Sequence, residues 1–258
     1  IDNLDYLEGL GVTAIWMTPV FRNKWVQVGT KHTGAGYHGY WITDFLDIDP
    51  HLGTKDDYRA LIEAAHARGI KVYMDIVVNH TADVVKYAEW HLPSGEQRPD
   101  AVNPRPDSSD RVPYKASYDY PWTRKGGIDG PVINQAFAAY PEDDPARFSR
   151  LEDRDYAYTP FIPAGEETVK NPAWLNEIWA YTNRGDSLFN GESSFYGDFV
   201  GLDDLLTEDP RVLQGLIEIY SYWIEEFGVD GFRIDTAKHV KPEFWHTFIP
   251  AIEAVARA

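Results

Sequence analysis

Three apolar stretches with the length of buried β-strands set the main constraint on the fold of this chain. They span residues 12–20, 70–78 and 229–234. Nearly continuous apolar runs of this kind are typical of parallel strands that are covered on both faces. Amphipathic stretches lie before and after them, so the sequence alternates between strand and helix. This alternation favours an α/β fold with parallel strand pairing.

Four helices are predicted around these strands, because apolar residues recur at helical spacing. Thr54 is a suitable N-cap for the second helix, and Gly228 is a suitable C-cap for the third. A short strand is predicted over residues 44–48, after a loop that reaches Tyr40. The four predicted helices span residues 1–10, 56–68, 210–227 and 243–258.

A long polar stretch interrupts this alternation. From residue 81 to about residue 206 the sequence is rich in Pro, Tyr and Trp and has few periodic runs, and it is far longer than an ordinary loop. We interpret it as an inserted subdomain at the carboxyl ends of the strands. Short helices are predicted within it near residues 134–140 and 172–183.

The strand count favours part of a barrel over a small independent sheet. A parallel sheet of three strands would leave two open edges, which is unfavourable. An eight-stranded barrel needs five more strands than this chain offers. We therefore expect three parts: residues 1–80 and 207–258 as two parts of an incomplete barrel, and residues 81–206 as the insert.

Polar residues gather where two of the predicted strands end. Arg233 and Asp235 have the same parity, so their side chains should leave the same face of a strand, and residues 238–239 follow in the next turn. Asp75 and residues 79–80 end the preceding strand. Because the carboxyl ends of parallel strands meet at one edge, these groups should share a pocket. Such a pocket suits glycosyl transfer, in which a carboxylate attacks the anomeric carbon. The alternative is a surface Arg–Asp pair without catalytic function.

Composition excludes several classes of function. The formal net charge of −17 argues against a nucleic-acid partner, which requires clustered Lys and Arg. The chain has no cysteine, so neither a disulfide scaffold nor a cysteine nucleophile is available. No apolar run reaches the roughly 18 residues of a membrane span, so no membrane partner is expected. The sequence does not indicate the oligomeric state.

Four motifs in the same order resemble the α-amylase family of glycoside hydrolases. They are residues 11–19 (GVTAIWMTP), 36–41 (GYHGYW), 75–80 (DIVVNH) and 231–239 (GFRIDTAKH). The resemblance covers residues 1–80 and about 200–258. It implies a partial (β/α)8 TIM barrel, with the long irregular subdomain inserted after the third barrel strand.

The resemblance also implies roles for individual residues. Asp235 matches the nucleophile that forms a covalent glycosyl-enzyme intermediate, and Arg233 would keep this carboxylate ionised and oriented. Tyr40 would stack on the sugar being cleaved and His80 would donate to one of its hydroxyls, although both could instead be buried structural residues. Lys238 and His239 would line the leaving-group side, and Asp75 would support the site structurally rather than chemically. The expected substrate-binding residues are Tyr40, Trp41, Asp75, His80, Lys238 and His239.

The same family often holds a calcium ion between barrel and insert. Asn79 matches one ligand, Asp204 a second, and the backbone oxygen of His239 a third. Oxygen ligands of this kind suit Ca²⁺. Two neighbours depart from the family pattern, since Asp203 stands where the family often has Pro and Leu206 where it often has Asp.

The function implied by the resemblance is hydrolysis of α-1,4-glucans such as starch with retention of configuration, most simply by an endo-acting α-amylase. A cyclodextrin- or pullulan-active hydrolase, a glucanotransferase and a non-catalytic amylase-like module are the alternatives. In the family the acid/base Glu follows the fifth barrel strand and a further Asp follows the seventh. Neither is expected within residues 1–258, so this segment alone should not hydrolyse starch. Starch is usually met outside the cell, so an extracellular or periplasmic location is expected.

Overall fold

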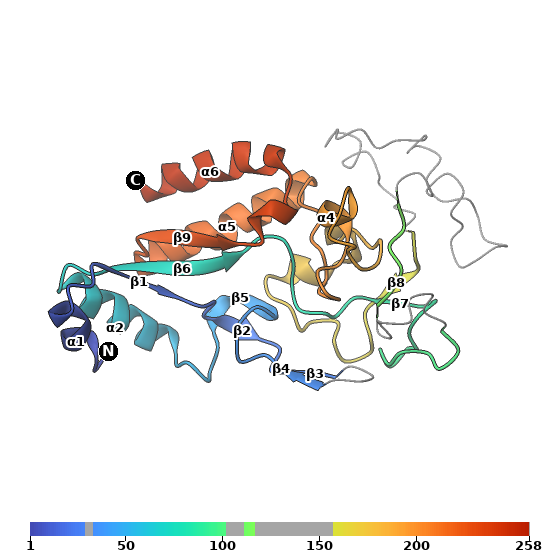
Figure 1. Ribbon diagram of the computed structural model, residues 1–258, viewed down its shortest axis with the longest axis horizontal. Helices are drawn as coiled ribbons and strands as arrows, with labels where there is room; N and C mark the ends of the chain where they lie inside the picture. The colour runs from blue at the N-terminus through green and yellow to red at the C-terminus, as the bar shows by residue number, and fades with distance from the viewer. Residues whose placement is uncertain (29–32, 102–110, 117–156, 258) are drawn as a thin grey trace.

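A sheet of three parallel strands lies in the left half of the molecule as drawn in Figure 1. The computed structural model describes residues 1–28, 33–101, 111–116 and 157–257. The strand order in the sheet is β1–β6–β9, and both pairings are parallel. The predicted parallel α/β arrangement is therefore confirmed. The three strands are β1 (Ala14–Met17), β6 (Lys71–Val77) and β9 (Gly231–Asp235).

Four α-helices occur where the sequence predicts them. The side chain of Thr54 accepts a hydrogen bond from the backbone N–H of Asp57, and the Asp57 side chain bonds back to Thr54, which completes a capping box. Gly228 ends its helix in the left-handed conformation, with φ 68°. Both predicted caps are confirmed. The helices are α1 (Leu4–Gly9), α2 (Lys55–His66), α5 (Pro210–Phe227) and α6 (Pro242–Ala256).

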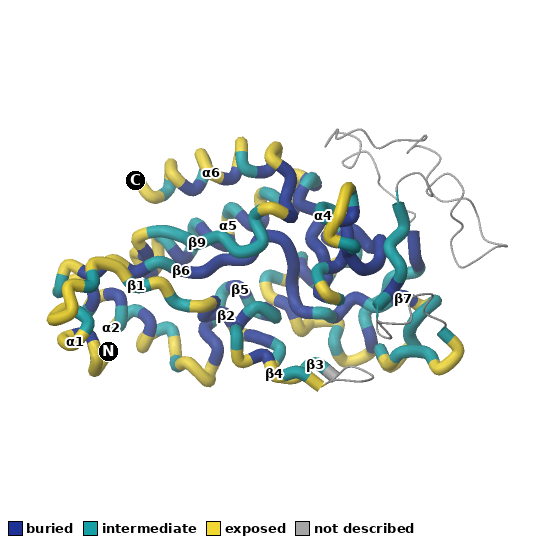
Figure 2. Tube along the Cα trace, in the orientation of Figure 1, coloured by how far each residue is buried: buried dark blue, intermediate teal, exposed yellow. Residues whose placement is uncertain are grey.

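The core lies between β6 and the long helix α5. Met74 and Ile76 of β6 are fully buried, as are Tyr220 and Trp223 of α5 (Figure 2). The Tyr220 hydroxyl donates to the backbone oxygen of Val77, at the carboxyl end of β6. The apolar side of β6 is thereby fixed against α5, and the polar side chains of the strand are left on the opposite face.

The first predicted strand is shorter and less buried than expected. Residues 12–20 were expected to form one buried strand, but β1 has four residues that alternate between exposed and half-buried. Trp16 remains 57% exposed. The physical reason is that β1 pairs with a single neighbour, β6, in the described part of the chain, and Pro19 cannot continue a strand ladder.

The segment before Tyr40, expected to be a loop, contains three short strands. β2 (Phe21–Asn23) pairs antiparallel with β5 (Ile42–Ile48), and β3 (Val26–Val28) pairs antiparallel with β4 (Thr33–Ala35). Strands of three residues are too short to give a clear alternation in the sequence. The predicted strand at 44–48 is confirmed as the second half of β5.

The described part of the insert contains little regular structure. β7 (Lys86–Tyr87) pairs with β8 (Pro160–Phe161). The helix predicted near 172–183 consists of two 3₁₀ turns, and the helix predicted near 134–140 lies outside the described residues. The remaining short elements are η3 (Ala173–Asn176), η4 (Ile178–Ala180), α4 (Ser193–Tyr196) and η5 (Ala237–His239). The division into residues 1–80, 81–206 and 207–258 stays a prediction. Among the described helices, none is both long and apolar enough to cross a membrane.

Gly39 provides a test of how the fold places Tyr40. Its φ is +85°, and an added Cβ would lie 2.4 Å from the backbone oxygen of Pro19. We expect Gly39→Ala to lower the free energy of unfolding by about 2–4 kcal/mol, since it combines backbone strain with a backbone clash. Gly69→Ala is the matched control, because its φ is +69° but nothing lies within 4 Å of its added Cβ. Denaturant unfolding of both variants should show the larger loss for Gly39→Ala, and equal losses would contradict this account.

Candidate active site

The register between β6 and β9 assembles the polar edge of the sheet. Asp75 pairs with Arg233, and Val77 pairs with Asp235. Because side chains on parallel strands alternate in step, Asp75, Arg233 and Asp235 leave the same face. An added Cβ at Gly231 would lie 2.6 Å from the ring of Tyr73, so glycine allows this ring to pack against the backbone at the start of β9. The predicted common face of Arg233 and Asp235 is confirmed.

Asp75 is the buried centre of this edge. It has no exposed surface, and its carboxylate receives hydrogen bonds from three side chains. The Tyr40 hydroxyl donates to Oδ2 at 2.9 Å, the Trp16 Nε1–H donates to Oδ2 at 3.2 Å, and Arg233 Nη1 lies 3.1 Å from both oxygens. Burial raises the pKa of Asp75, and the bonds from Tyr40 and Arg233 oppose that effect.

Asp235 is held more openly than Asp75. Arg233 Nη1 donates to Asp235 Oδ1 at 2.5 Å, so one guanidinium nitrogen joins both carboxylates. The Asp235 side chain is 22% exposed, and that of Arg233 is 41% exposed. The guanidinium also lies 5.1 Å from the centre of the Trp16 ring, a cation–π contact. Asp235 is thus oriented and still accessible.

Tyr40 and Trp41 have different surroundings. The Tyr40 ring stacks with His38, and burial together with the bond to Asp75 raises the pKa of Tyr40 to about 12. Its hydroxyl therefore stays protonated and donates to Asp75. The Trp41 ring lies over the β3–β4 hairpin, where an added Cβ at Gly34 would be 2.8 Å from it. Trp41 therefore packs against the backbone of β4 at Gly34, and the role of Trp41 in substrate binding stays a prediction.

His80 is a buried neutral histidine at the end of β6. It is 1% exposed, and burial lowers the pKa of His80 to about 4. Its ring stacks on Phe199 at a centroid distance of 5.3 Å. The ring interacts with the backbone of Tyr40, while Nε2 makes no hydrogen bond of normal geometry with the described residues. A neutral imidazole can donate a hydrogen bond from one ring nitrogen and accept one at the other.

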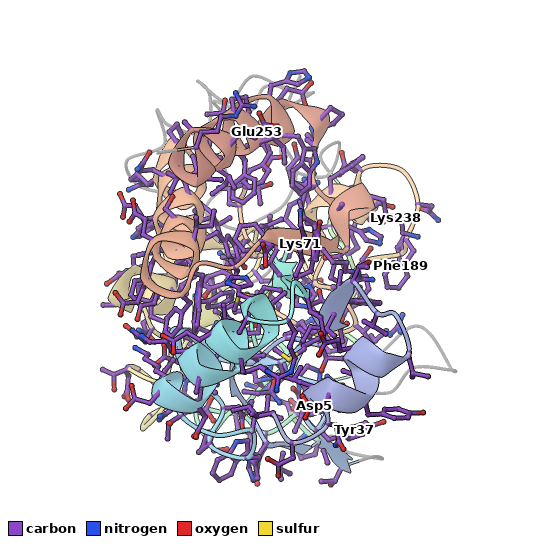
Figure 3. The ribbon with its side chains drawn as sticks, turned by 90° about the vertical axis from the view of Figure 1, so that its left-hand side faces the viewer. Asp5, Tyr37, Lys71, Phe189, Lys238 and Glu253 are labelled. Atoms are coloured by element: carbon purple, nitrogen blue, oxygen red, sulfur yellow. The ribbon has the colours of Figure 1, made fainter. Side chains whose placement is uncertain are left out.

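Lys238 and His239 continue the same edge beyond β9. Lys238 is exposed, whereas His239 is 6% exposed and its Nδ1 lies 2.9 Å from the backbone oxygen of Ser194. The rings of Phe189 and Phe199 lie 5.8 and 5.1 Å from that of His239. Figure 3 shows the Lys238 and Phe189 side chains on the same side of the molecule. The structure therefore brings the insert against the end of β9.

Two of the predicted calcium ligands are in direct contact. The Asn79 side-chain amide donates to Asp204 Oδ1 at 3.1 Å, and the Thr182 hydroxyl lies 3.3 Å from Oδ2. Asp198 accepts the backbone N–H of Asp204. Burial raises the pKa of Asp204 well above its usual range. Across the residues that the structure describes, no three His, Cys, Asp or Glu side chains converge as a metal-binding group, so any ion here would need amide and backbone oxygens as well.

Several residues of the site were not predicted individually. Trp16 was identified only as part of a motif, although it contacts both Asp75 and Arg233. Phe199 and Asp198 lie in the irregular insert, where no periodicity marks them. Their positions depend on contacts with distant segments, such as the hydrogen bond from the Tyr87 hydroxyl to Asp198. A sequence motif could have indicated Trp16 but not the other two.

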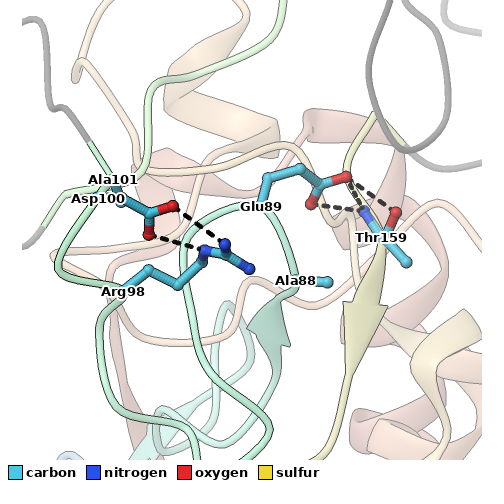
Figure 4. A pocket seen from close by; sticks show the side chains of 6 residues that line it. All are labelled: Ala88, Glu89, Arg98, Asp100, Ala101 and Thr159. Atoms are coloured by element: carbon cyan, nitrogen blue, oxygen red, sulfur yellow. Dashed lines mark hydrogen bonds and ion pairs between the residues drawn. The ribbon is translucent and has the colours of Figure 1, made fainter. Parts of the chain in front are cut away.

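A polar pocket of about 350 Å³ lies in the insert, away from these residues (Figure 4). Glu89 accepts hydrogen bonds from the N–H and hydroxyl of Thr159, and Arg98 forms an ion pair with Asp100. The charged groups are therefore already paired within the wall. None of the predicted site residues lines this pocket, whose lining consists of Ala88, Glu89, Arg98, Asp100, Ala101 and Thr159.

Comparison with known proteins identifies a consistent set of relatives. Residues 1–248 match the family described as "Alpha amylase, catalytic domain". An α-amylase of Streptomyces lividans is 45% identical over 99% of this chain, and a periplasmic α-amylase of Escherichia coli is 27% identical over 99%. The chain spans 25% and 37% of their respective lengths. The crystal structure of a Geobacillus thermoleovorans α-amylase complexed with acarbose superposes with a TM-score of 0.51 at 27% identity, over 98% of this chain and 37% of that one.

The buried carboxylate of Asp75 gives a test of the site's geometry. We expect Asp75→Asn to lower the free energy of unfolding by about 2–3 kcal/mol, because it removes the charge that balances Arg233 and weakens three hydrogen bonds. Asp47→Asn is the matched control, since the Asp47–Arg22 pair is 34% and 49% exposed and should change stability by less than about 1 kcal/mol. Denaturant unfolding measures both, and a loss at Asp75 no greater than at Asp47 would contradict the prediction.

Proposed function

The chain belongs to the α-amylase family, and we propose that the complete protein carrying it is a retaining glycoside hydrolase of α-1,4-glucans. The three parallel strands are part of the (β/α)8 barrel of this family, and the predicted fold class is confirmed. The strands β1, β6 and β9 correspond to its second, third and fourth barrel strands by the motif order found in the sequence.

One observation carries the proposal. Asp235 lies at the carboxyl end of a parallel strand, accessible, and oriented by an arginine that is itself anchored on a fully buried carboxylate. This is the arrangement that a carboxylate nucleophile requires. An Asp235 oxygen would attack the anomeric carbon and form a glycosyl ester as the glycosidic C–O bond breaks. The leaving oxygen takes a proton from a second carboxyl group in its acid form, and water then hydrolyses the ester with the resulting carboxylate acting as base.

The proton donor of this reaction is proposed to lie outside residues 1–258. In a retaining enzyme the two carboxyl groups stand about 5–5.5 Å apart. Asp75 is unsuited to this role, because its carboxylate is fully buried and bonded to Arg233, Tyr40 and Trp16. We assign Asp75 to support of the site and leave acid/base catalysis to the glutamate expected after the fifth barrel strand.

The sugar-binding roles follow from the positions of the remaining side chains. His80 would donate to a hydroxyl of the sugar being cleaved, since it lies at the end of β6 and burial keeps its ring neutral. Tyr40 would stack on the same sugar, with Trp41 beside it, while Lys238 and His239 would line the leaving-group side. The co-crystallised acarbose of the Geobacillus relative supports an oligosaccharide as ligand.

An endo-acting α-amylase is the specific activity that we propose. The α-amylase at 45% identity supports it, as does the Lys238–His239 pair after the nucleophile. A cyclodextrin- or pullulan-active hydrolase, or a glucanotransferase, remains the alternative. Chromatography of the products from starch, pullulan and cyclodextrin separates these activities. The periplasmic location of the Escherichia coli relative supports an extracellular or periplasmic location for this protein.

We propose calcium as a structural ion beside the site. Asn79 and Asp204 are buried neighbours, with the Asn79 amide N–H donating to Asp204 Oδ1, and Ca²⁺ accepts amide, carboxylate and backbone oxygens together. Asp204 is contacted on both oxygens by neutral donors, so a cation would compensate its buried charge. The backbone oxygen of His239 would complete the link between insert and barrel. The ion would hold these segments together without taking part in bond cleavage.

Asp235→Asn tests the nucleophile. In the complete protein we expect turnover of soluble starch to fall by at least 10⁴-fold, because the amide cannot form the glycosyl ester. Binding of a maltooligosaccharide, measured by calorimetry, should change less than about tenfold. Asp56→Asn, on the exposed first turn of α2, is the control with unchanged turnover. If Asp235→Asn keeps substantial turnover, another residue is the nucleophile.

Calcium removal tests the proposed ion. Calcium at a hundred times its dissociation constant should add about 2.7 kcal/mol of stability relative to the calcium-free protein. Thermal unfolding in EDTA and in increasing CaCl₂ should therefore show a rising melting temperature for the complete protein. The variant Asp204→Asn should melt at a temperature that calcium hardly changes. A melting temperature independent of calcium in the unaltered protein would rule the ion out.

A further inference from the structure

Lys170 and Asp203 form the most completely buried ion pair in the described part of the chain. Lys170 Nζ lies 2.5 Å from Asp203 Oδ2, and the two side chains are 0% and 4% exposed. The ammonium also donates to the Tyr181 hydroxyl at 2.9 Å and lies 4.3 Å from the centre of that ring. Removing two charges from water is expensive, so a pair this deep needs further bonds to persist. The role of this pair was not predicted from the sequence.

Asp203 holds both sides of the turn that follows His80. Its backbone oxygen accepts the N–H of Thr81 at 3.0 Å. Its side-chain Oδ2 accepts the N–H groups of Val84 and Val85, each at 2.9 Å. A single residue thus fixes the start and the end of the segment 81–85, through which the chain leaves β6 for the insert. An apolar residue in place of Asp203 could not satisfy the two buried N–H groups.

This turn is coupled directly to the sugar-binding residues. The backbone of His80 forms an isolated antiparallel β-bridge with that of Asp204, the residue after Asp203. Ala82, inside the turn, donates its N–H to the backbone oxygen of Ile42, two residues after Tyr40. A change in the turn would therefore move the backbones that carry His80 and Tyr40. Asp203 directly precedes Asp204, so the Asp203 carboxylate influences the position of His80 through the backbone and need not contact the substrate.

Lys170 gives the carboxylate its position. Asn171, the next residue, donates its N–H to the backbone oxygen of Thr43 and accepts that of Phe45, so this segment is fixed on β5. The Lys170 ammonium is aimed from this fixed segment at Asp203. We propose that Asp203 and Lys170 are positioning residues for His80: Asp203 fixes the turn after His80, and Lys170 holds Asp203 in place. This inference rests on the proposed sugar-binding role of His80.

Two double variants of the complete protein separate the ion pair from the hydrogen bonds that it positions. K170M/D203N removes both charges but leaves a side-chain oxygen for Val84 and Val85. K170M/D203L removes both charges and that oxygen while keeping the same number and branching of side-chain heavy atoms at position 203. We expect kcat/KM on maltoheptaose to fall by about 3–10-fold for the Asn variant, which keeps the acceptor but loses the contact with Lys170 that holds it, and by about 10–100-fold for the Leu variant, with cooperative melting retained in both. Unchanged kcat/KM for the Asn variant would remove Lys170 from the positioning role.

A mutant cycle with His80→Ala shows whether the effect runs through His80. In the His80→Ala background, K170M/D203L should lower kcat/KM by no more than about threefold, because residues that act together are not additive. A full additive loss there, or unchanged kcat/KM for K170M/D203L alone, overturns the proposal. So does a His80→Ala protein with full activity. If K170M/D203L does not melt cooperatively, K170M/D203A replaces it, with the same expected results.

The two proposals fail in different ways. Retained turnover in Asp235→Asn overturns the proposed nucleophile. The mutant cycle with His80→Ala can still be measured, because it needs only the glycan hydrolysis of the unaltered protein as its reference. If Asp235→Asn is inactive but the losses of kcat/KM in the His80→Ala cycle are additive, only the positioning role of Lys170 and Asp203 is overturned.

Discussion

The buried charge of Asp75 is the constraint on which the site depends. A carboxylate without solvent contact persists only when other groups compensate it. Its partners come from three separate segments: Trp16 on β1, Tyr40 before β5, and Arg233 on β9. The parallel register that pairs Asp75 with Arg233 is therefore more than a feature of the sheet. It places the Arg233 guanidinium beside the buried Asp75 carboxylate and compensates its charge. The same guanidinium also donates to Asp235.

The sequence predicts this frame well because its signals are local. Apolar runs mark β6 and β9, helical periodicity marks α2 and α5, and Thr54 and Gly228 mark helix ends through bonds made within a few residues. The shared face of Arg233 and Asp235 follows from strand parity alone. The motif order then places His80 and Tyr40 near that face. These predictions need no knowledge of which distant segments meet.

Prediction fails where structure comes from distant contacts. Pairing with β5, which lies 19 or more positions further along the chain, makes Phe21–Asn23 a strand, since these residues have no strand pattern of their own. The exposure of Trp16 depends on how many neighbours β1 has, which its own residues do not encode. Lys170 resembles any surface lysine until the insert returns to Asp203, 33 positions later in the chain. The departure from the family pattern at Asp203 was visible in the sequence, but its partner was not.

The two carboxylates on the polar edge differ in a way that supports separate roles. Asp75 receives hydrogen bonds from three side chains and lies out of contact with solvent, so it can neither approach a substrate nor change its charge cheaply. Asp235 receives its side-chain bond from Arg233 among the described residues and keeps part of its surface accessible. A nucleophile needs this second environment, since attack requires an oxygen that is oriented but not enclosed. The buried aspartate supports the accessible one, because the same guanidinium nitrogen of Arg233 is bonded to both carboxylates.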